Sequence, residues 1–226
     1  MKGSCLYRRS GKRLLDVVAA LGLLLLLLPV FAGVALAVRV ALGSPVIFKQ
    51  SRPGRHGALF SLLKFRTMTN ERDERGELLP SGMRMTSLGR VLRKTSLDEL
   101  PELLNVVRGD MSLVGPRPWP VRYLAFYNER EMRRHDVRPG LTGLAQVSGR
   151  SHLDWDSRLE LDVEYVEHLS VLLDLRILLK TATAVLRREG VVEEDRVRVI
   201  PLDEWRLGRS REGITREPFS GGSDLG

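Results

Sequence analysis

The longest apolar stretch of the chain lies close to its N-terminus. Residues 14–38 are almost wholly apolar and include consecutive leucines from Leu23 to Leu28. As one straight helix they would reach roughly 37 Å, which exceeds a hydrocarbon core of about 30 Å. Pro29 breaks or kinks such a helix, because it removes a backbone donor and clashes with the preceding turn. The two limbs, about 15 and about 9 residues long, are each too short to cross a membrane.

Basic residues flank this stretch on both sides. The positive-inside rule therefore gives no orientation for a crossing and favours both ends staying in the cytoplasm. A signal peptide also begins with a basic and then an apolar region, but no clear small-residue cleavage site follows. The sequence thus favours a re-entrant, kinked helix over a spanning one. The flanking cations are Lys2, Arg8, Arg9, Lys12 and Arg13 before the stretch, and Arg39, Lys49, Arg52 and Arg55 after it.

Downstream, short strand-like segments give way to helical patterns. Residues 46–50 and 58–65 read as two strands joined by a turn rich in Pro and Gly. A short helix over 102–107 is ended by Gly109. Amphipathic helical patterns follow, with core packing as the default interpretation and contact with lipid as the alternative. They cover residues 121–134, 155–167 and 171–188, while residues 70–76 predict a surface loop or short helix and 138–143 predict glycine-rich turns.

These elements predict an α/β fold, a small mixed globular domain that carries amphipathic helices. The 226 residues suffice for one ordinary core with appendages and not for two large domains. We expect a basic N-terminus and membrane helix over residues 1–42, a catalytic domain over 43–195, and a polar, disordered tail over 196–226.

The formal net charge of +8 predicts anionic partners. Aromatic residues make up only 6% of the chain, and no zinc-like or nucleic-acid-binding motif is present. Phosphorylated ligands or an anionic membrane face are therefore better candidates than nucleic acid. The single cysteine, Cys5, excludes an internal disulfide and fits a reducing compartment.

The strongest candidate for chemistry is the adjacent pair Asp98 and Glu99. A basic run precedes it, including Arg93, and Arg117 follows between two prolines. A carboxylate in cationic surroundings can attack a phosphate ester or bind a metal ion, while the cations hold the charge of the substrate. The stiff loop around Arg117 would order its guanidinium for bidentate phosphate binding.

Asp98 and Glu99 also have a purely structural interpretation, which the sequence does not exclude. Ser96 and Glu99 have the spacing of a helix capping box, in which Asp98 would only complement the helix dipole. Pro101 argues against a helix that begins at Leu97, because it would remove the first backbone bond. A helix that starts nearer Pro101, with the two acids on the turn before it, fits at least as well.

The sequence offers further cations for phosphate binding. Lys64 and Arg66 alternate along the second strand, so they share a face, although solvated strand charges are the commoner case. Arg150 ends a glycine-rich region whose backbone amides could approach phosphates, which alone is a weak signal.

Taken together and in order, the motifs resemble the bacterial sugar transferase family, the small monotopic phosphoglycosyl transferases. Within the family the chain is most similar to the bacillosamine-phosphate transferase type, which is the catalytic domain alone. Leu28 stands where relatives often have Ser, and Glu102 replaces a frequent Gln. The motifs that carry the resemblance are Phe48-x-Gln50-x-Arg52-x-Gly54, Lys64-Phe65-Arg66-Thr67-Met68, Ser96-Leu97-Asp98-Glu99-Leu100-Pro101, Gly109-Asp110-Met111-Ser112-Leu113-Val114-Gly115-Pro116-Arg117-Pro118 and Arg138-Pro139-Gly140-Leu141-Thr142-Gly143.

The resemblance implies an enzyme on the cytoplasmic face of the bacterial inner membrane. It would move a sugar 1-phosphate from a UDP-sugar to undecaprenyl phosphate and release UMP, as the first membrane step of glycan assembly. It also implies a re-entrant helix hairpin, interfacial helices in contact with membrane lipids, and an N-acetylhexosamine derivative as the sugar. The resemblance leaves open whether the protein forms a homodimer.

The resemblance also implies roles for individual residues. Asp98 would be the nucleophile that forms a phosphosugar–enzyme intermediate, and Glu99 would help to hold Mg²⁺ or manage protons. Both carboxylates are candidate metal ligands, because Mg²⁺ usually takes one or two carboxylates and completes its shell with phosphate oxygens and water. Candidates for binding phosphates and uridine are Lys64, Arg66, Arg93, Arg117 and Arg150.

Two other functions compete with this one. A non-catalytic adaptor at the membrane surface would explain the charge and the apolar stretch, but it gives no reason for two acids between arginines. A Mg²⁺-dependent phosphatase or pyrophosphatase would pass the phosphoryl group to water. The products formed with and without polyprenyl phosphate distinguish these alternatives.

Overall fold

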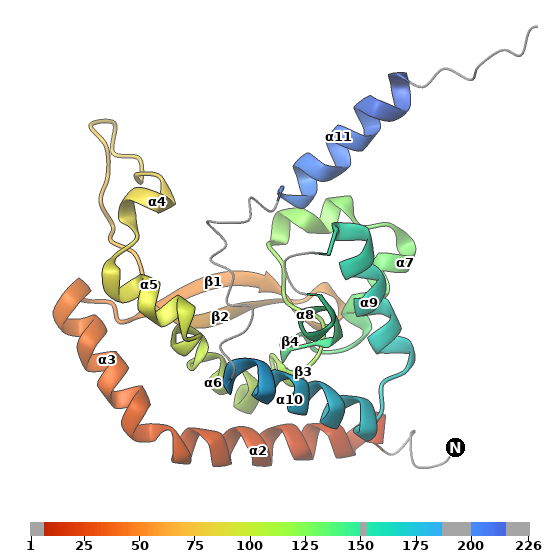
Figure 1. Cartoon of the computed structure of the whole chain (residues 1–226), viewed down its shortest axis with the longest axis horizontal. Helices are drawn as coiled ribbons and strands as arrows, with labels where there is room; N and C mark the ends of the chain where they lie inside the picture. The colour runs from red at the N-terminus through yellow and green to blue at the C-terminus, as the bar shows by residue number, and fades with distance from the viewer. Residues whose placement is uncertain (1–6, 150–152, 187–199, 216–226) are drawn as a thin grey trace, which may run out of the picture.

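The computed structural model describes residues 7–149, 153–186 and 200–215 of the chain (Figure 1). It is a small mixed α/β domain in which helices surround two short sheets. The elements run η1 (Tyr7–Gly11), α2 (Lys12–Leu26), α3 (Leu28–Leu42), β1 (Ile47–Pro53), η2 (Arg55–Gly57), β2 (Leu59–Phe65), α4 (Ser81–Arg84), α5 (Ser87–Lys94), η3 (Leu97–Glu99), α6 (Glu102–Arg108), β3 (Ser112–Val114), η4 (Val121–Phe126), α7 (Glu129–Met132), η5 (Arg133–Asp136), β4 (Gly140–Thr142), α8 (Leu144–Ser148), α9 (Trp155–Glu167), α10 (Val171–Leu186) and α11 (Leu202–Thr215).

The apolar stretch forms two helices that meet at an angle. α2 and α3 have 15 residues each and are bent by 65° at Leu27. Pro29 lies in the first turn of α3, where its missing N–H costs no hydrogen bond. The second limb is longer than the sequence suggested, because Arg39 stands in its last turn and complements the helix dipole. Within the described ranges neither helix alone has the length and composition to cross a membrane, but the bent pair taken together does.

The outer sides of these helices carry apolar side chains in contact with solvent. Leu25 is 75% exposed and Val40 79% exposed, whereas Ala20 and Val38 are fully buried against the domain. α10 lies alongside α2 at the lower edge of the molecule (Figure 1) and is apolar on its outer side as well. Its exposed apolar residues include Val171, Leu172, Leu175, Leu179 and Val185.

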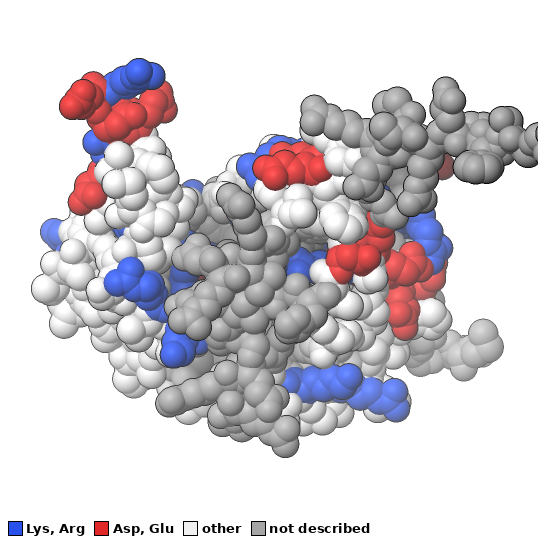
Figure 2. All heavy atoms as spheres, turned by 45° about the horizontal axis from the view of Figure 1, so that its top comes forward, with Lys and Arg blue, Asp and Glu red and all other residues white. Residues whose placement is uncertain are grey.

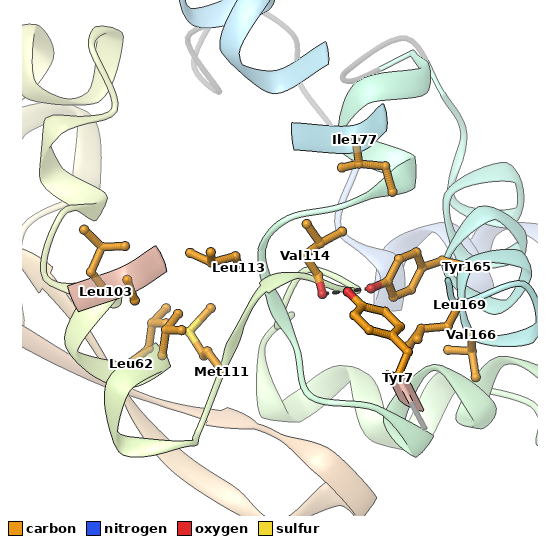
Figure 3. Packing of buried hydrophobic residues seen from close by; sticks show 12 residues of the cluster. Tyr7, Leu62, Leu103, Met111, Leu113, Val114, Tyr165, Val166, Leu169 and Ile177 are labelled. Carbon is orange, nitrogen blue, oxygen red and sulfur yellow. Dashed lines mark hydrogen bonds between the residues drawn. The ribbon is translucent and has the colours of Figure 1, made fainter. Parts of the chain in front are cut away.

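The predicted strands form an antiparallel hairpin. β1 pairs with β2, with Phe48 opposite Lys64 and Pro53 opposite Leu59, so β1 runs three residues further than residue 50. α6 packs on β2, and the main core lies between α6, α2, the second sheet and α9. Figure 3 shows this core, in which Tyr165 donates a hydrogen bond to the carbonyl of Val114 at 3.0 Å.

The expected glycine-rich turns over 138–143 are partly a strand. β4 pairs in parallel with β3, with Ser112 opposite Gly140 and Val114 opposite Thr142. The two segments approach so closely that a Cβ on Gly140 would lie 2.1 Å from the backbone nitrogen of Gly115. Glycine therefore serves close packing of two backbones here.

The single helix expected over residues 121–134 is wrong, because the chain breaks it into η4, α7 and η5. Asn128 restarts the helix with a capping box in which its side chain accepts from the N–H of Glu131 and Glu131 accepts in return. Arg134, a charged residue near the end of this segment, is only 2% exposed.

Residues 69–85 form a narrow projection, in which a loop is followed along the chain by α4. Arg72 bridges to Leu78 and Met68 to Met85, so the polar segment 70–76 is an extended loop and not a helix. Gly76 has a φ of 80°, a value that glycine adopts without strain. Figure 2 shows acidic and basic side chains gathered at the tip of the projection.

The C-terminal helical patterns are confirmed, but the tail differs from expectation. α9 has the predicted bounds and α10 the predicted start. Where a disordered tail was expected, residues 202–215 form α11, which extends away from the domain in Figure 1. Its first residue, Leu202, is fully buried in an aromatic cluster, and Arg206 on its second turn pairs with Glu131, so apolar and charged contacts both attach the start of this helix to the domain. The cluster around it contains Trp119, Tyr123, Phe126, Tyr127, Trp155, Leu159 and Trp205.

Candidate active site

Asp98 and Glu99 lie on a tight turn between two helices. α5 begins at the N-cap Thr86, whose hydroxyl accepts from the N–H of Gly89 at 2.9 Å. After α5, Ser96 adopts a left-handed conformation with a φ of 55°, and the single turn η3 carries both acids. Because a non-glycine residue at positive φ costs of order 1 kcal/mol, the surrounding structure must hold this turn in place.

The capping-box interpretation of the turn is wrong. Ser96 makes no side-chain cap bond, and the Glu99 carboxylate turns toward cations instead. The alternative placement of the helix is confirmed, since α6 begins at Glu102 with Pro101 as its N-cap residue.

Glu99 is held by two cations from separate parts of the chain. Its Oε1 accepts from Lys64 Nζ on β2 at 2.6 Å and from Arg117 Nη2 at 2.9 Å. Burial would raise the pKa of Glu99, but the charges of Arg117 and Lys64 outweigh it and lower the pKa to about 2. Glu99 is therefore ionised, and it fixes both cations next to Asp98.

Asp98 is buried but has no such clamp. The residue is 7% exposed, and within the described part of the chain no hydrogen bond or ion pair engages its carboxylate. Burial raises its pKa, with a further rise from Glu99, while Lys64, Arg93 and Arg117 oppose the rise. A desolvated carboxylate near three cations is suited to attack an electrophile whose negative charge those cations attract.

Glu102 completes the cluster, although the sequence did not single it out as a site residue. Its Oε1 lies 3.2 Å from Lys64 Nζ, and it is 3% exposed. Burial and then the charge of Glu99 raise the pKa of Glu102 to about 7. The sequence did contain one indication of this role: Glu102 stands three positions after Glu99, and residues three apart near the start of a helix lie on the same side. Three acids therefore surround Lys64, whose pKa is raised even though burial opposes this.

The other cations that were predicted to bind phosphate do not all lie beside Asp98 and Glu99. Arg93, in the last turn of α5, donates to the hydroxyl of Thr67 at 3.3 Å and lies close enough to Asp98 to act on it electrostatically. Arg66 stands just after the end of β2, and its guanidinium donates to the carbonyl of Ser44 at 3.0 Å. The structure thus does not bring Arg66 to the carboxylates with Lys64. Arg150 lies outside the described residues.

The donor set fits a magnesium ion that is held jointly with a substrate. Among the described residues no three His, Cys, Asp or Glu side chains form a metal-binding group. Asp98 and Glu99 supply adjacent carboxylates, and Asp98 has no hydrogen-bond or ion-pair partner among the described residues. Since Mg²⁺ is commonly bound by one or two carboxylates plus substrate phosphates and water, two carboxylates suffice when a diphosphate completes the shell.

Comparison with known proteins agrees with the motifs at this site. The model of the family described as bacterial sugar transferase matches residues 7–188. An uncharacterized sugar transferase of Bacillus subtilis is 52% identical over 186 residues, which cover 82% of this chain and 92% of the relative. A UDP-glucose:undecaprenyl-phosphate glucose-1-phosphate transferase of Caulobacter vibrioides is 43% identical over 189 residues, covering 79% and 71% respectively. An undecaprenyl-phosphate galactose phosphotransferase of Salmonella typhimurium is 41% identical over 206 residues, covering 82% of this chain and 43% of the relative. The chain therefore belongs to the bacterial sugar transferase family.

Proposed function

We propose that the protein is an enzyme that transfers a sugar 1-phosphate from a UDP-sugar to undecaprenyl phosphate and releases UMP. The observation that carries the proposal is the buried carboxylate of Asp98, without a hydrogen-bond partner in the described parts of the chain, beside Glu99, which Lys64 and Arg117 hold in place. The relatives named as glucose-1-phosphate and galactose phosphotransferases act with undecaprenyl phosphate, which supports the same lipid acceptor here.

In the first step an Asp98 carboxylate oxygen attacks the β-phosphorus of the UDP-sugar. The bond from that phosphorus to the bridging oxygen breaks, and the bridging oxygen leaves with UMP. The sugar phosphoryl group remains on Asp98 as an acyl phosphate. Lys64, Arg93 and Arg117 lie around Asp98 and attract the negative charge of the diphosphate.

In the second step a phosphate oxygen of undecaprenyl phosphate attacks the same phosphorus. The bond to Asp98 breaks, which returns the free carboxylate and leaves a lipid-linked sugar diphosphate. Two anionic substrates then use one site in turn, so the kinetics are ping-pong. The burial of Asp98 disfavours attack by water on the intermediate.

Asp98 and Glu99 would hold Mg²⁺ together with the diphosphate. The ion would neutralise charge on the phosphate oxygens as a Lewis acid. Glu99 has a second task in this arrangement, because it keeps Lys64 and Arg117 within reach of the same phosphates.

The apolar helices support a reaction at a membrane surface. We propose that α2 and α3 enter the cytoplasmic leaflet as a re-entrant hairpin and that α10 lies on membrane lipids, with the domain in the cytoplasm. The 65° bend, the exposed leucines and the basic flanks support this placement. A lipid phosphate could then reach Asp98 while its polyprenyl chain stays in the bilayer.

The motifs and the named relatives lead to different expectations about which sugar is transferred. The resemblance in the motifs favours an N-acetylhexosamine derivative, whereas two relatives are named for glucose and galactose. A panel of UDP-sugars tests both. Purified protein in detergent with Mg²⁺ should release UMP over many turnovers only when undecaprenyl phosphate is present, and the lipid product identifies the donor.

The covalent step has its own test. With radiolabelled UMP and no lipid acceptor, the wild-type protein should exchange label into the UDP-sugar, whereas Asp98→Asn should not. Asp136→Asn, at an exposed position, should exchange normally. Phosphoryl transfer to water alone would support a phosphatase, and no turnover with any donor by folded protein would support the adaptor.

A further inference from the structure

Arg134 carries a buried charge that the proposed chemistry does not use. It lies on η5 with its side chain 1% exposed, and Asp162 on α9 is its counter-ion. Asp162 Oδ2 accepts from Arg134 Nη2 at 2.7 Å and from Nε at 3.1 Å. A buried ion pair is weak support for stability, because desolvation offsets most of the attraction and apolar side chains often serve as well. This guanidinium therefore suggests a task that an apolar side chain could not perform.

The third contact of Arg134 identifies that task. Nη2 also donates to the main-chain carbonyl of Arg117 at 2.7 Å. Arg117 stands between Pro116 and Pro118, and prolines have a fixed φ, so the carbonyl is a firm point on a stiff loop. The side chain of the same residue donates to Glu99 in the candidate active site. A continuous path of polar contacts thus runs from Asp162 through Arg134 and Arg117 to Glu99.

The surroundings hold Arg134 in one orientation. Tyr127 accepts from Nη1 through its hydroxyl at 3.3 Å, and the guanidinium carbon lies 5.4 Å from the centre of the Tyr127 ring. His135, the next residue, is neutral near pH 7, because burial and the charge of Arg134 lower its pKa to about 4. Asp162 is therefore the charge that balances Arg134.

We propose that Arg134 is a positioning residue, which fixes the main chain at Arg117 so that the Arg117 guanidinium reaches Glu99 and the substrate. The proposal rests on the proposed transferase function. Arg134→Lys keeps the positive charge for Asp162 but loses the planar fork that reaches both Asp162 and the Arg117 carbonyl. We expect it to fold and to lose about 10- to 100-fold in kcat/KM, because small displacements of positioning groups cost this much.

A double-mutant cycle distinguishes positioning from general support. If Arg134 acts through Arg117, then Arg134→Lys should change kcat/KM by less than about 3-fold in an Arg117→Ala background. Additive losses would overturn the proposal. Arg130→Lys is the matched control, because Arg130 on α7 pairs with Glu160 on the same α9 but at an exposed site. It should change kcat/KM by less than about 2-fold.

Two further measurements keep the test decisive. Should Arg134→Lys fail to fold, Tyr127→Phe removes one orienting contact, and its smaller loss should also vanish in the Arg117→Ala background. Hydrogen exchange of the amides of Gly115, Arg117 and Trp119 gives a readout without turnover. Exchange should be faster in Arg134→Lys and unchanged in Arg130→Lys. Unchanged exchange in Arg134→Lys would overturn the positioning, whereas an inactive wild type with the expected exchange would overturn only the transferase.

Discussion

Lys12 Nζ lies 2.6 Å from Asp174 Oδ2, which joins the first turn of α2 to the first turn of α10. The Asp174 carboxylate also accepts from Tyr7 and from Tyr165, at 2.5 Å and 2.7 Å respectively. Both helices carry exposed apolar side chains, so this contact fixes the two proposed lipid-facing elements relative to each other.

Asp174→Asn should destabilise the protein by about 3 kcal/mol, because it leaves the partly buried Lys12 without its nearest counter-ion. Thermal unfolding in detergent should show a melting temperature lower by roughly 6–12 °C. Glu160→Gln breaks an ion pair whose side chains are both about half exposed, and it should cost less than about 1 kcal/mol. Equal shifts in the two variants would contradict a structural role for the buried contact.

Glu102→Gln should stabilise the protein at high pH. The pKa of Glu102 is raised to about 7 by burial and then by Glu99, from a usual value of 4.5. The folded state thus binds this proton more tightly than the unfolded state, and its contribution to the free energy of unfolding falls as pH rises from about 4.5 to about 7. We expect a gain of roughly 2–3 kcal/mol for Glu102→Gln at pH 8 and almost none at pH 4.

Glu99→Gln should show the opposite sign in the same denaturation series. The pKa of Glu99 is lowered to about 2, because Arg117 and Lys64 together outweigh burial, so its stabilisation is present above pH 4.5 and is lost as pH falls toward 2. The variant should be less stable than the wild type at pH 8, and the difference should shrink on acidification. Glu74→Gln, at an exposed site, should follow the wild type at every pH.

Arg117→Lys should lower kcat/KM for the UDP-sugar by about 10- to 100-fold while leaving the fold intact. Lysine keeps the charge but loses the planar fork that can bond Glu99 and a phosphate together. Steady-state UMP release measures the effect. Arg108→Lys, at an exposed position of α6, should retain activity within about 2-fold, and a similar loss there would point to a general effect of basic charge.

Pro29→Ala should change the topology of the apolar pair. Without Pro29 a helix can continue through the bend at Leu27, and a continuous helix over residues 12–42 of roughly 46 Å could cross the bilayer. Cys5, the single cysteine, reports the side on which the N-terminus lies. An impermeant maleimide should label it in inverted wild-type vesicles but not in right-side-out ones, whereas Pro29→Ala should show a fraction labelled in right-side-out vesicles.

A cysteine placed at Glu74 in a Cys5→Ser background serves as the topology control. It should be labelled only in inverted vesicles in both the wild-type and the Pro29→Ala chain. Labelling of Cys5 on the outside of the wild type would contradict the re-entrant hairpin and support a spanning helix.

Several structural elements of this protein could be predicted from its sequence alone, because they depend on neighbouring residues. Pro29 predicted the broken helix, the turn around Gly54 predicted the β1–β2 hairpin, and Pro101 predicted where α6 begins. Each of these depends on backbone restrictions or on periodic patterns that act within a few residues. The order and spacing of the motifs also identified the family, which the match over residues 7–188 confirms.

Contacts between distant segments were decided only by the tertiary structure. The sequence placed Lys64 and Arg66 on one face, but β2 ends at Phe65, so the first reaches Glu99 and the second reaches Ser44. Likewise the amphipathic pattern over residues 121–134 does not indicate that Arg134 is buried against Asp162, which lies 28 residues later and is its counter-ion. Charge pairing across such distances depends on how helices and sheets pack, and periodicity within a segment carries no information about it.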